Sequence, residues 1–401
     1  MALENGNYEN DINLTVHVSR GVLKLIGVWP TRTRRSVAKN ISLILLRILC
    51  HFLLSFIFIP SLLHVILKEK DPRRKLKSVG PLCYCLMAIL KYTVLLCREE
   101  KLKDCMTLLE DDWRQVVIEK DRLTMLENAR IGRSIAILCV GFVFISGFSY
   151  RIIVPISRGT IITAQNITIR PLAHAGYFVF FDHQETPNYE IIYTIQIMAG
   201  FVTYSVTSGA CSLAALYILH ACGQLKILIR RMEELVKFSN AKSSEIDEKI
   251  AMLVKHHMRV NSFLMGIENA MQHTCLVEVV GCTLVLCLLG YYIIMEWQDS
   301  NALAMLTYTV LLVTFIFNIF IYCFIGELLT DQALKVATAS CTLEWFHLPN
   351  RTARCLILIM AISNRPVKMT AGKLIDLSLN SFGAVVRTSV AYLNMLRATS
   401  I

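Results

Sequence analysis

The chain has 401 residues, of which 55% are hydrophobic and 18% are charged, and its mean hydropathy is +0.52. This composition excludes a water-soluble globular protein and places the chain in a lipid bilayer. The formal net charge is +11, but the basic residues cluster between apolar stretches, which is typical of membrane topology and not of a nucleic-acid-binding surface.

Seven apolar stretches are long enough to cross a bilayer, whose hydrocarbon core of roughly 30 Å requires about 20 helical residues. They predict an all-α integral membrane protein with one domain over residues 1–401. Residues 219–269 and 330–370 are more polar and contain helically periodic segments, which predicts a cytoplasmic helical anchor region. The predicted spans are residues 41–67, 76–97, 131–155, 190–219, 270–295, 302–329 and 371–396.

The distribution of Lys and Arg predicts the orientation. Most of these residues lie in the connectors that are cytoplasmic if the N-terminus is cytoplasmic, and seven spans then place the C-terminus outside the cell. The basic run over residues 68–77 contradicts this rule locally. Asn166, in the sequon Asn166-Ile167-Thr168, lies in the long connector predicted outside and is a candidate glycosylation site, although similar sequons at Asn13, Asn40 and Asn350 lie on the predicted inner side.

Polar and aromatic side chains gather in the predicted outer halves of spans two, three, four and six. Pockets for small apolar molecules have aromatic walls and few hydrogen-bonding groups, so the set indicates a ligand-binding pocket, although helix packing explains any single member equally well. Gln196 should point inward, because an amide in mid-span is costly against lipid. The candidates are Tyr84, Met87, Phe142, Ser146, Tyr150, Tyr193, Gln196, Phe201, Tyr308 and Phe315.

Several charged residues fall inside predicted spans, and Arg47, Lys91, Glu278 and Arg387 are among them. Arg47 and Lys91 lie near predicted inner ends, where long side chains can reach the headgroups. Glu278 is deeper in the fifth span. Arg387, in the middle of the last span, is expected either to pair across subunits or to contact water in a conduction path.

The end of the last span carries Tyr392, Met395, Ala398 and Thr399 at three- and four-residue steps on one helical face. An apolar Met395 followed by small or polar residues is suited to a constriction that loses its water when closed. By periodicity alone, a buried interface helix without a pore explains the pattern better.

Motifs for catalysis are missing from the sequence. It contains no Gly-rich phosphate loop, no HExxH and no GxSxG, so neither an enzyme nor a bound cofactor is expected. His256 and His257 are adjacent and point to different faces of a helix, which favours solvated cytoplasmic histidines over a metal site. The last span lacks the Asn-Pro-x-x-Tyr run of rhodopsin-like receptors, which makes G-protein coupling a minor alternative.

The last quarter of the chain closely resembles the insect odorant receptor family. The resemblance rests on the succession 322–327, 344–349, 370–373 and 388–397, which reads YCFIGE, EWFHLP, TAGK and TSVAYLNMLR. Residues 25–30, 200–211 and 220–225 extend it to nearly the whole chain, with features seen in ants, bees and wasps.

This resemblance implies a ligand-gated, non-selective cation channel whose central pore is lined by the last helix of each of four subunits, so that Tyr392, Met395, Ala398 and Thr399 become pore residues. It assigns Glu327 and Trp345 to the cytoplasmic anchor. The short connector 226–259 suggests an odorant-binding tuning subunit that forms a heterotetramer with a coreceptor. The expected ligand is a small volatile apolar molecule, and the expected location is the plasma membrane of olfactory sensory neuron dendrites, in contact with membrane lipids. A gustatory-type receptor, a G-protein-coupled receptor and a secondary transporter remain alternatives.

Overall fold

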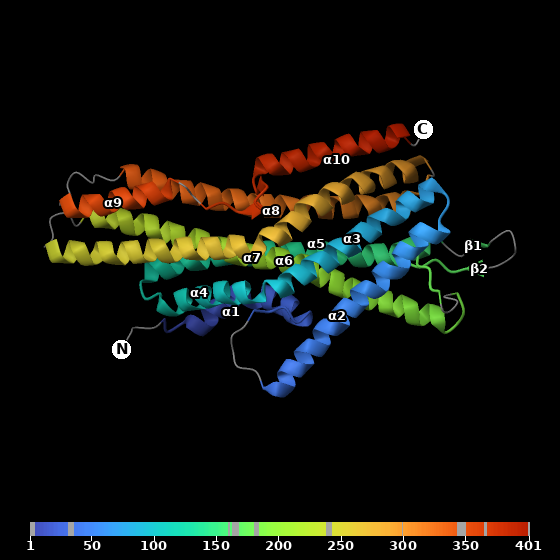
Figure 1. The fold of residues 1–401 in the computed structure, drawn as a ribbon, viewed down its shortest axis with the longest axis horizontal. Helices are drawn as coiled ribbons and strands as arrows, with labels where there is room; N and C mark the ends of the chain where they lie inside the picture. Colours follow the sequence, from blue (N-terminus) through green and yellow to red (C-terminus); the bar gives the residue numbers. More distant parts are fainter. Residues whose placement is uncertain are drawn as a thin grey trace.

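The computed structural model describes residues 5–30, 36–158, 161–162, 168–179, 184–237, 243–298, 300–342, 350–364 and 367–399. They form an elongated helical bundle (Figure 1). The helices are α1 (Tyr8–Leu25), α2 (Val37–Leu63) with a π-helical turn (His64–Lys68), α3 (Pro72–Cys97), α4 (Glu99–Gln115), α5 (Glu119–Arg158), α6 (Asn188–Lys237), α7 (Ser243–Gln298), α8 (Ala302–Thr342), α9 (Asn350–Ser363) and α10 (Leu379–Thr399). Two short antiparallel hairpins complete the fold, β1 (Ile161–Ile162) with β2 (Thr168–Ile169), and β3 (Thr370–Ala371) with β4 (Ile375–Asp376).

Six helices in the described part of the chain are long and apolar enough to cross a membrane, namely α2, α3, α5, α6, α7 and α8. The last helix, α10, is not among the six. It contains Arg387 and Arg397, which lower its hydropathy, but its 21 residues would extend about 31 Å, the thickness of a bilayer core. The protein is therefore an all-helical membrane protein, and α10 is long enough to be a seventh crossing.

The central helix of the bundle is α6, which packs against α5, α7, α8 and α1. Small residues such as Ala210, Ala214 and Ala215 are completely buried on it and allow neighbouring backbones to approach closely. With 50 and 56 residues, α6 and α7 measure about 75 and 84 Å, so both continue well beyond a bilayer. Figure 1 shows their extended ends beside α9, opposite to β1 and β2.

The outward face of α2 carries a row of exposed apolar side chains from Ile41 onward. Ile41, Leu45, Ile48 and Phe52 are all more than half exposed in the isolated chain. Such a continuous apolar surface is unfavourable in water and matches the acyl chains of a bilayer. This face of α2 is therefore suited to contact with lipid.

The predicted span 371–396 is wrong at its beginning. Gly372 and Lys373 adopt positive φ angles of 62° and 61°, which right-handed helices exclude, and they form the turn between β3 and β4. The Leu374 N–H closes this turn on the Ala371 carbonyl at 3.1 Å. The helix therefore begins at Leu379, and α10 runs along the outside of the bundle from its middle toward the end where β1 and β2 lie (Figure 1).

The histidines expected to be solvated are instead packed. His257 is buried, and His256 Nε2 lies 3.0 Å from Gln224 Oε1 on α6. Nearby, Asp112 of α4 bridges α6 and α7 through His220 at 3.0 Å and Arg259 at 2.6 Å. Burial alone would raise the pKa of Asp112, but the hydrogen bonds from His220 and Arg259 outweigh it and lower that pKa. These contacts join α4 to the extended ends of α6 and α7.

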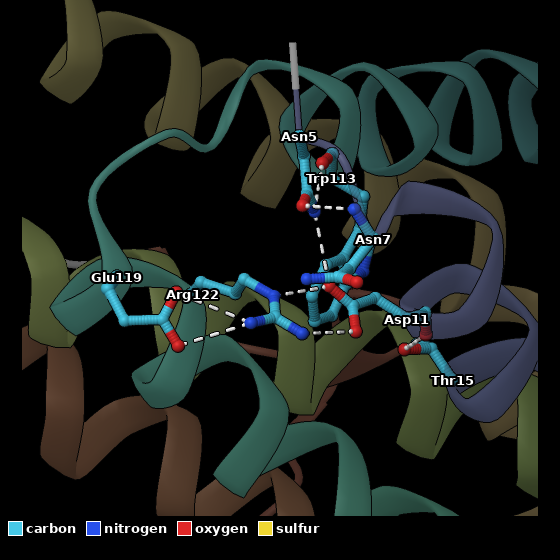
Figure 2. A network of polar contacts seen from close by, with 7 residues as sticks. All are labelled: Asn5, Asn7, Asp11, Thr15, Trp113, Glu119 and Arg122. Atoms are coloured by element: carbon cyan, nitrogen blue, oxygen red, sulfur yellow. Dashed lines mark hydrogen bonds and ion pairs between the residues drawn. The ribbon is translucent and has the colours of Figure 1, made fainter.

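The first helix is fixed to the bundle by a carboxylate–guanidinium pair. Figure 2 shows Asp11 of α1 facing Arg122 of α5, whose Nε and Nη2 donate to the two carboxylate oxygens at 2.7 and 3.1 Å. Asn5 adds a bond to Asp11 Oδ2 at 3.1 Å and one to the Trp113 carbonyl at 3.2 Å. Arg122 also contacts Glu119, which is largely exposed. The buried carboxylate of Asp11 is therefore the centre of this network.

Asp11→Asn should destabilise the protein by about 1.5–3 kcal/mol, because it removes a charge-assisted, two-point interaction from a buried position. Thermal unfolding of the detergent-solubilised protein measures the effect. Glu119→Gln is the matched control, since an exposed partner of the same Arg122 contributes about 1 kcal/mol or less. Equal losses of stability in the two variants would contradict the conclusion that Asp11 is the centre of this network.

Candidate functional site

A cavity of about 50 Å³ lies between α3, α5, α6, α7 and α8, in the half of the bundle that leads to β1 and β2. A single water molecule requires about 10–15 Å³ by the same measure, so the space accommodates a few waters or one small molecule. Its wall is mostly aromatic and aliphatic. The lining residues are Gly80, Pro81, Tyr84, Gly147, Tyr150, Arg151, His174, Tyr204, Val285, Leu289, Tyr292, Tyr308, Leu311 and Phe315.

The aromatic wall is held by ring contacts and hydroxyl bonds. Tyr84 meets Phe315 edge to face at 5.2 Å between ring centroids, and the rings of Tyr292 and Tyr308 lie 5.4 Å apart. The Tyr292 hydroxyl accepts the Gly80 N–H at 2.8 Å, an approach that a side chain at position 80 would block. These contacts join α3, α7 and α8 around the cavity.

Arg151 of α5 reaches the cavity wall and is 1% exposed. Its Nε donates to the Tyr204 hydroxyl and its Nη1 to the Gln196 carbonyl, both at 2.7 Å. Glycines at 147 and 200 make room for this arrangement, since a Cβ at Gly147 would overlap the Tyr204 ring and one at Gly200 would overlap the Arg151 side chain. The Tyr204 hydroxyl in turn donates to the Gly147 carbonyl at 2.6 Å. The guanidinium is therefore held in a fixed position.

The loop before α6 folds into the bundle and covers the cavity. His174 is buried, and its carbonyl and N–H bond to the Gln196 side chain at 2.9 and 3.3 Å. The Tyr177 N–H donates to the Pro60 carbonyl of α2 at 2.9 Å. Burial lowers the pKa of His174 well below its ordinary value, and the charge of Arg151 adds to this effect. Both effects favour the neutral form of the imidazole.

Four of the ten predicted pocket residues line this cavity, namely Tyr84, Tyr150, Tyr308 and Phe315. Four polar lining residues are not among the predicted ones, namely Arg151, His174, Tyr204 and Tyr292. The available signal was the charge of Arg151 at the end of an apolar span, because a buried charge requires partners. No local pattern distinguishes the three others from ordinary packing residues.

Two predicted residues support the cavity from behind its wall. Gln196 points inward, as its place in an apolar span requires, and holds the covering loop through His174. The Tyr193 hydroxyl donates to the Arg151 carbonyl at 3.3 Å.

The remaining four predicted pocket residues lie elsewhere. Met87 and Ser146 are buried in helix contacts. Phe142 and Phe201 are 40% and 36% exposed, and their rings pack on neighbouring phenylalanines at the surface of the bundle. The aromatic character of Phe142 and Phe201 therefore serves the outer surface.

A second polar cluster lies deeper in the bundle. Lys91 of α3 forms an ion pair with Glu278 of α7, and both side chains are 0% exposed. Asn318 of α8 donates to Glu278 Oε1 at 2.6 Å, and Cys282 donates to the same oxygen at 3.0 Å. The expectation that Lys91 reaches the headgroups is therefore wrong, because its ammonium is paired within the protein. The cluster joins three helices that also line the cavity.

The helix α10 packs against α7, on the outside of the bundle. Ser389 donates to the Thr283 carbonyl at 3.0 Å, and Leu393 lies against Gly290, where a Cβ would come within 2.9 Å of it. Tyr392 and Met395 are 47% and 66% exposed, and Ala398 is also exposed. The side chain of Thr399 lies outside the described residues. Three of the predicted pore residues, Tyr392, Met395 and Ala398, therefore lie on an outward face of α10.

Glu327 contacts the start of α10, where its Oε2 accepts the N–H of Leu379 at 3.1 Å. A carboxylate at this position satisfies one of the unpaired N–H groups of the first turn. Trp345, the other predicted anchor residue, and Asn166, the candidate glycosylation site, lie outside the described residues. Within them, no cluster of three or more His, Cys, Asp or Glu side chains has the geometry of a metal site.

These features define a polytopic helical membrane protein with an aromatic cavity that is suited to a small molecule. A model of the 7tm odorant receptor family matches residues 71–390. The chain belongs to this family, which is a family of receptors and not of enzymes.

Curated relatives from insects match at low identity. Odorant receptor 10 of Aedes albopictus is 20% identical over 57% of this chain and 60% of its own length, and odorant receptor 13a of Drosophila melanogaster is 24% identical over 57% and 62%. The match thus spans about three fifths of these relatives. Odorant receptor 33a of Drosophila melanogaster is 24% identical over 84% of this chain and 87% of its own.

Solved structures show the same fold. The olfactory receptor OR5 of the insect Machilis hrabei in complex with eugenol superposes with a TM-score of 0.82, covering 98% of this chain and 100% of that one at 13% identity. A second structure of the same receptor superposes with a TM-score of 0.79, covering 97% of this chain and 99% of that one at 15% identity.

Proposed function

We propose that this chain is the odorant-binding tuning subunit of a ligand-gated, non-selective cation channel. In this proposal it forms a heterotetramer with a coreceptor in the plasma membrane of olfactory sensory neuron dendrites, with the N-terminus in the cytoplasm and the C-terminus outside. The cavity receives a small volatile ligand, and α10 lines the pore.

The observation that carries the proposal is that α7 is common to the cavity and to α10. Val285, Leu289 and Tyr292 of α7 line the cavity, while Thr283 and Gly290 of the same helix contact α10. A ligand that fits the cavity better when α7 has moved shifts α10 with it. The ligand opens the channel only to the extent that it binds the open arrangement more tightly than the closed one.

The test is whole-cell current in cells that express this chain with or without an insect coreceptor, challenged with volatile compounds under G-protein block. A ligand-evoked cation current that requires the coreceptor and survives the block supports the proposal. A response abolished by the block indicates a G-protein-coupled receptor, and current without the coreceptor favours a gustatory-type channel. Ligand uptake without channel current indicates a secondary transporter.

Substitutions in the proposed pore and in the cavity should change different properties of the current. Met395→Ala is expected to change basal leak or relative ion permeability, because it removes an apolar side chain from the proposed constriction, while the EC50 stays within about threefold.

Tyr308→Ala is expected to raise the EC50 about tenfold or more, because it removes part of the aromatic wall, without changing permeability. Single-channel recordings and dose–response curves measure both. The separation is wrong if both substitutions alter nothing except surface expression.

A further inference from the structure

The cavity contains a permanent positive charge that its own wall does not neutralise. Arg151 is the one lining residue with such a charge among those described. No carboxylate in the described part of the chain forms an ion pair with Arg151. By contrast, Lys91, the other deeply buried cation near these helices, is paired with Glu278.

The guanidinium is only partly satisfied. A guanidinium carries five N–H donors. Within the described part of the chain, Arg151 makes two side-chain hydrogen bonds, from Nε to the Tyr204 hydroxyl and from Nη1 to the Gln196 carbonyl. Both acceptors are neutral, so they replace water but do not supply the opposite charge. A buried cation in this state strongly favours an anionic partner.

The apolar lining of the cavity is suited to the hydrocarbon part of a ligand. Val285, Leu289, Leu311 and Phe315 present hydrocarbon surface, and the tyrosine rings close the wall around it. Arg151 is held in place before any ligand arrives, so little ordering is required on binding. The site thus combines one fixed cation with an apolar compartment for a short hydrocarbon group.

We propose that the cavity takes small organic acids in their carboxylate form, with the carboxylate on the guanidinium of Arg151 and the hydrocarbon chain against α7 and α8. A planar guanidinium matches a carboxylate through two parallel N–H bonds, which gives direction as well as charge. This inference rests on the proposed function, because it names the ligand class of the same cavity.

The first experiment uses matched triplets of a carboxylic acid, its methyl ester and the corresponding alcohol, on linear skeletons of four to ten carbons and on phenyl-substituted ones. Current is recorded with the coreceptor present. At least one acid should have an EC50 about tenfold or more below those of its ester and alcohol. Currents evoked by esters or alcohols without any acid preference overturn the ligand class but leave the proposed function standing. No current from any compound at normal surface delivery overturns the proposed function.

The pH dependence of the EC50 of the wild-type protein shows whether the carboxylate or the neutral acid binds. Raising the external pH from 5.8 to 7.3 lowers the neutral acid fraction about thirtyfold and hardly changes the carboxylate concentration. The EC50 expressed as total acid should therefore stay within about threefold. A thirtyfold rise would show that the neutral acid is the ligand and would overturn the proposal.

Substitutions of Arg151 test whether this residue causes the preference for the acid. Arg151→Gln should raise the EC50 of the preferred acid about thirtyfold or more and change that of the alcohol by less than about threefold, because only the acid uses the charge. Arg74→Gln is the matched control, because Arg74 is an exposed arginine that pairs with Asp71 away from the cavity lining, and it should leave both values unchanged. An equal shift for acid and alcohol in Arg151→Gln overturns the assignment. Should Arg151→Gln fail to reach the surface, Arg151→Lys keeps the charge, and the triplet and pH experiments on the wild type still decide.

Discussion

Replacement of Glu278 with glutamine is expected to remove most of the protein from the cell surface. Neither side chain of the Lys91–Glu278 pair is exposed, so the substitution leaves a buried ammonium without its counter-charge. Removing one partner of a buried ion pair typically costs about 3–5 kcal/mol. That is a large share of the stability of a folded domain. Surface labelling and the thermal midpoint of the solubilised protein measure the loss.

A double substitution tests the mechanism of this loss. Lys91→Met together with Glu278→Gln removes both charges, and the glutamine carbonyl can still accept the bond from Asn318, so the double variant should be more stable than Glu278→Gln alone. The control is Arg74→Gln, which breaks the exposed pair of Arg74 with Asp71 and should change stability by about 1 kcal/mol or less. A Glu278→Gln protein with wild-type stability would mean that Lys91 finds another way to satisfy its charge.

Replacement of Gly326 with alanine should displace the start of α10 and disturb gating. Gly326 of α8 lies against the backbone of Leu377. A Cβ atom at position 326 would overlap the carbonyl oxygen of Leu377 and lie 2.7 Å from the Cβ of Leu377. The next residue, Glu327, accepts the first N–H of α10 from Leu379. Overpacking of this kind costs about 1–3 kcal/mol, enough to shift a closed–open equilibrium about tenfold. The ratio of basal to ligand-evoked current per surface receptor should change accordingly.

The matched control for this substitution is Gly141→Ala on α5. A Cβ at Gly141 meets nothing within 4 Å, so this substitution should be neutral or slightly stabilising. Glu327→Ala should disturb gating as well, because it removes the acceptor for the Leu379 N–H. Normal gating in Gly326→Ala would show that the contact of α8 with Leu377 does not position α10.

The long helices follow from local sequence properties. Each of α2, α3, α5, α6, α7 and α8 contains a predominantly apolar segment that is long enough to cross a membrane. A helix suits such a segment because it satisfies the backbone hydrogen bonds within the segment itself. The start of α10 is different. The sequence around Gly372 and Lys373 forms a hairpin that docks on α7, where the Gly372 N–H donates to the Gln272 carbonyl at 2.9 Å. Hydropathy does not detect such a turn.

The sequence by itself thus determined the class of protein, the order of its membrane helices and the aromatic composition of the region that forms the cavity, since these properties belong to single segments. Only the tertiary structure decided which side chains meet. Lys91 pairs with Glu278, Arg151 lies at the cavity with no carboxylate partner among the described residues, and Phe142 turns outward. These outcomes depend on the rotation and depth of each helix relative to its neighbours, which are set by close packing and polar contacts between distant segments.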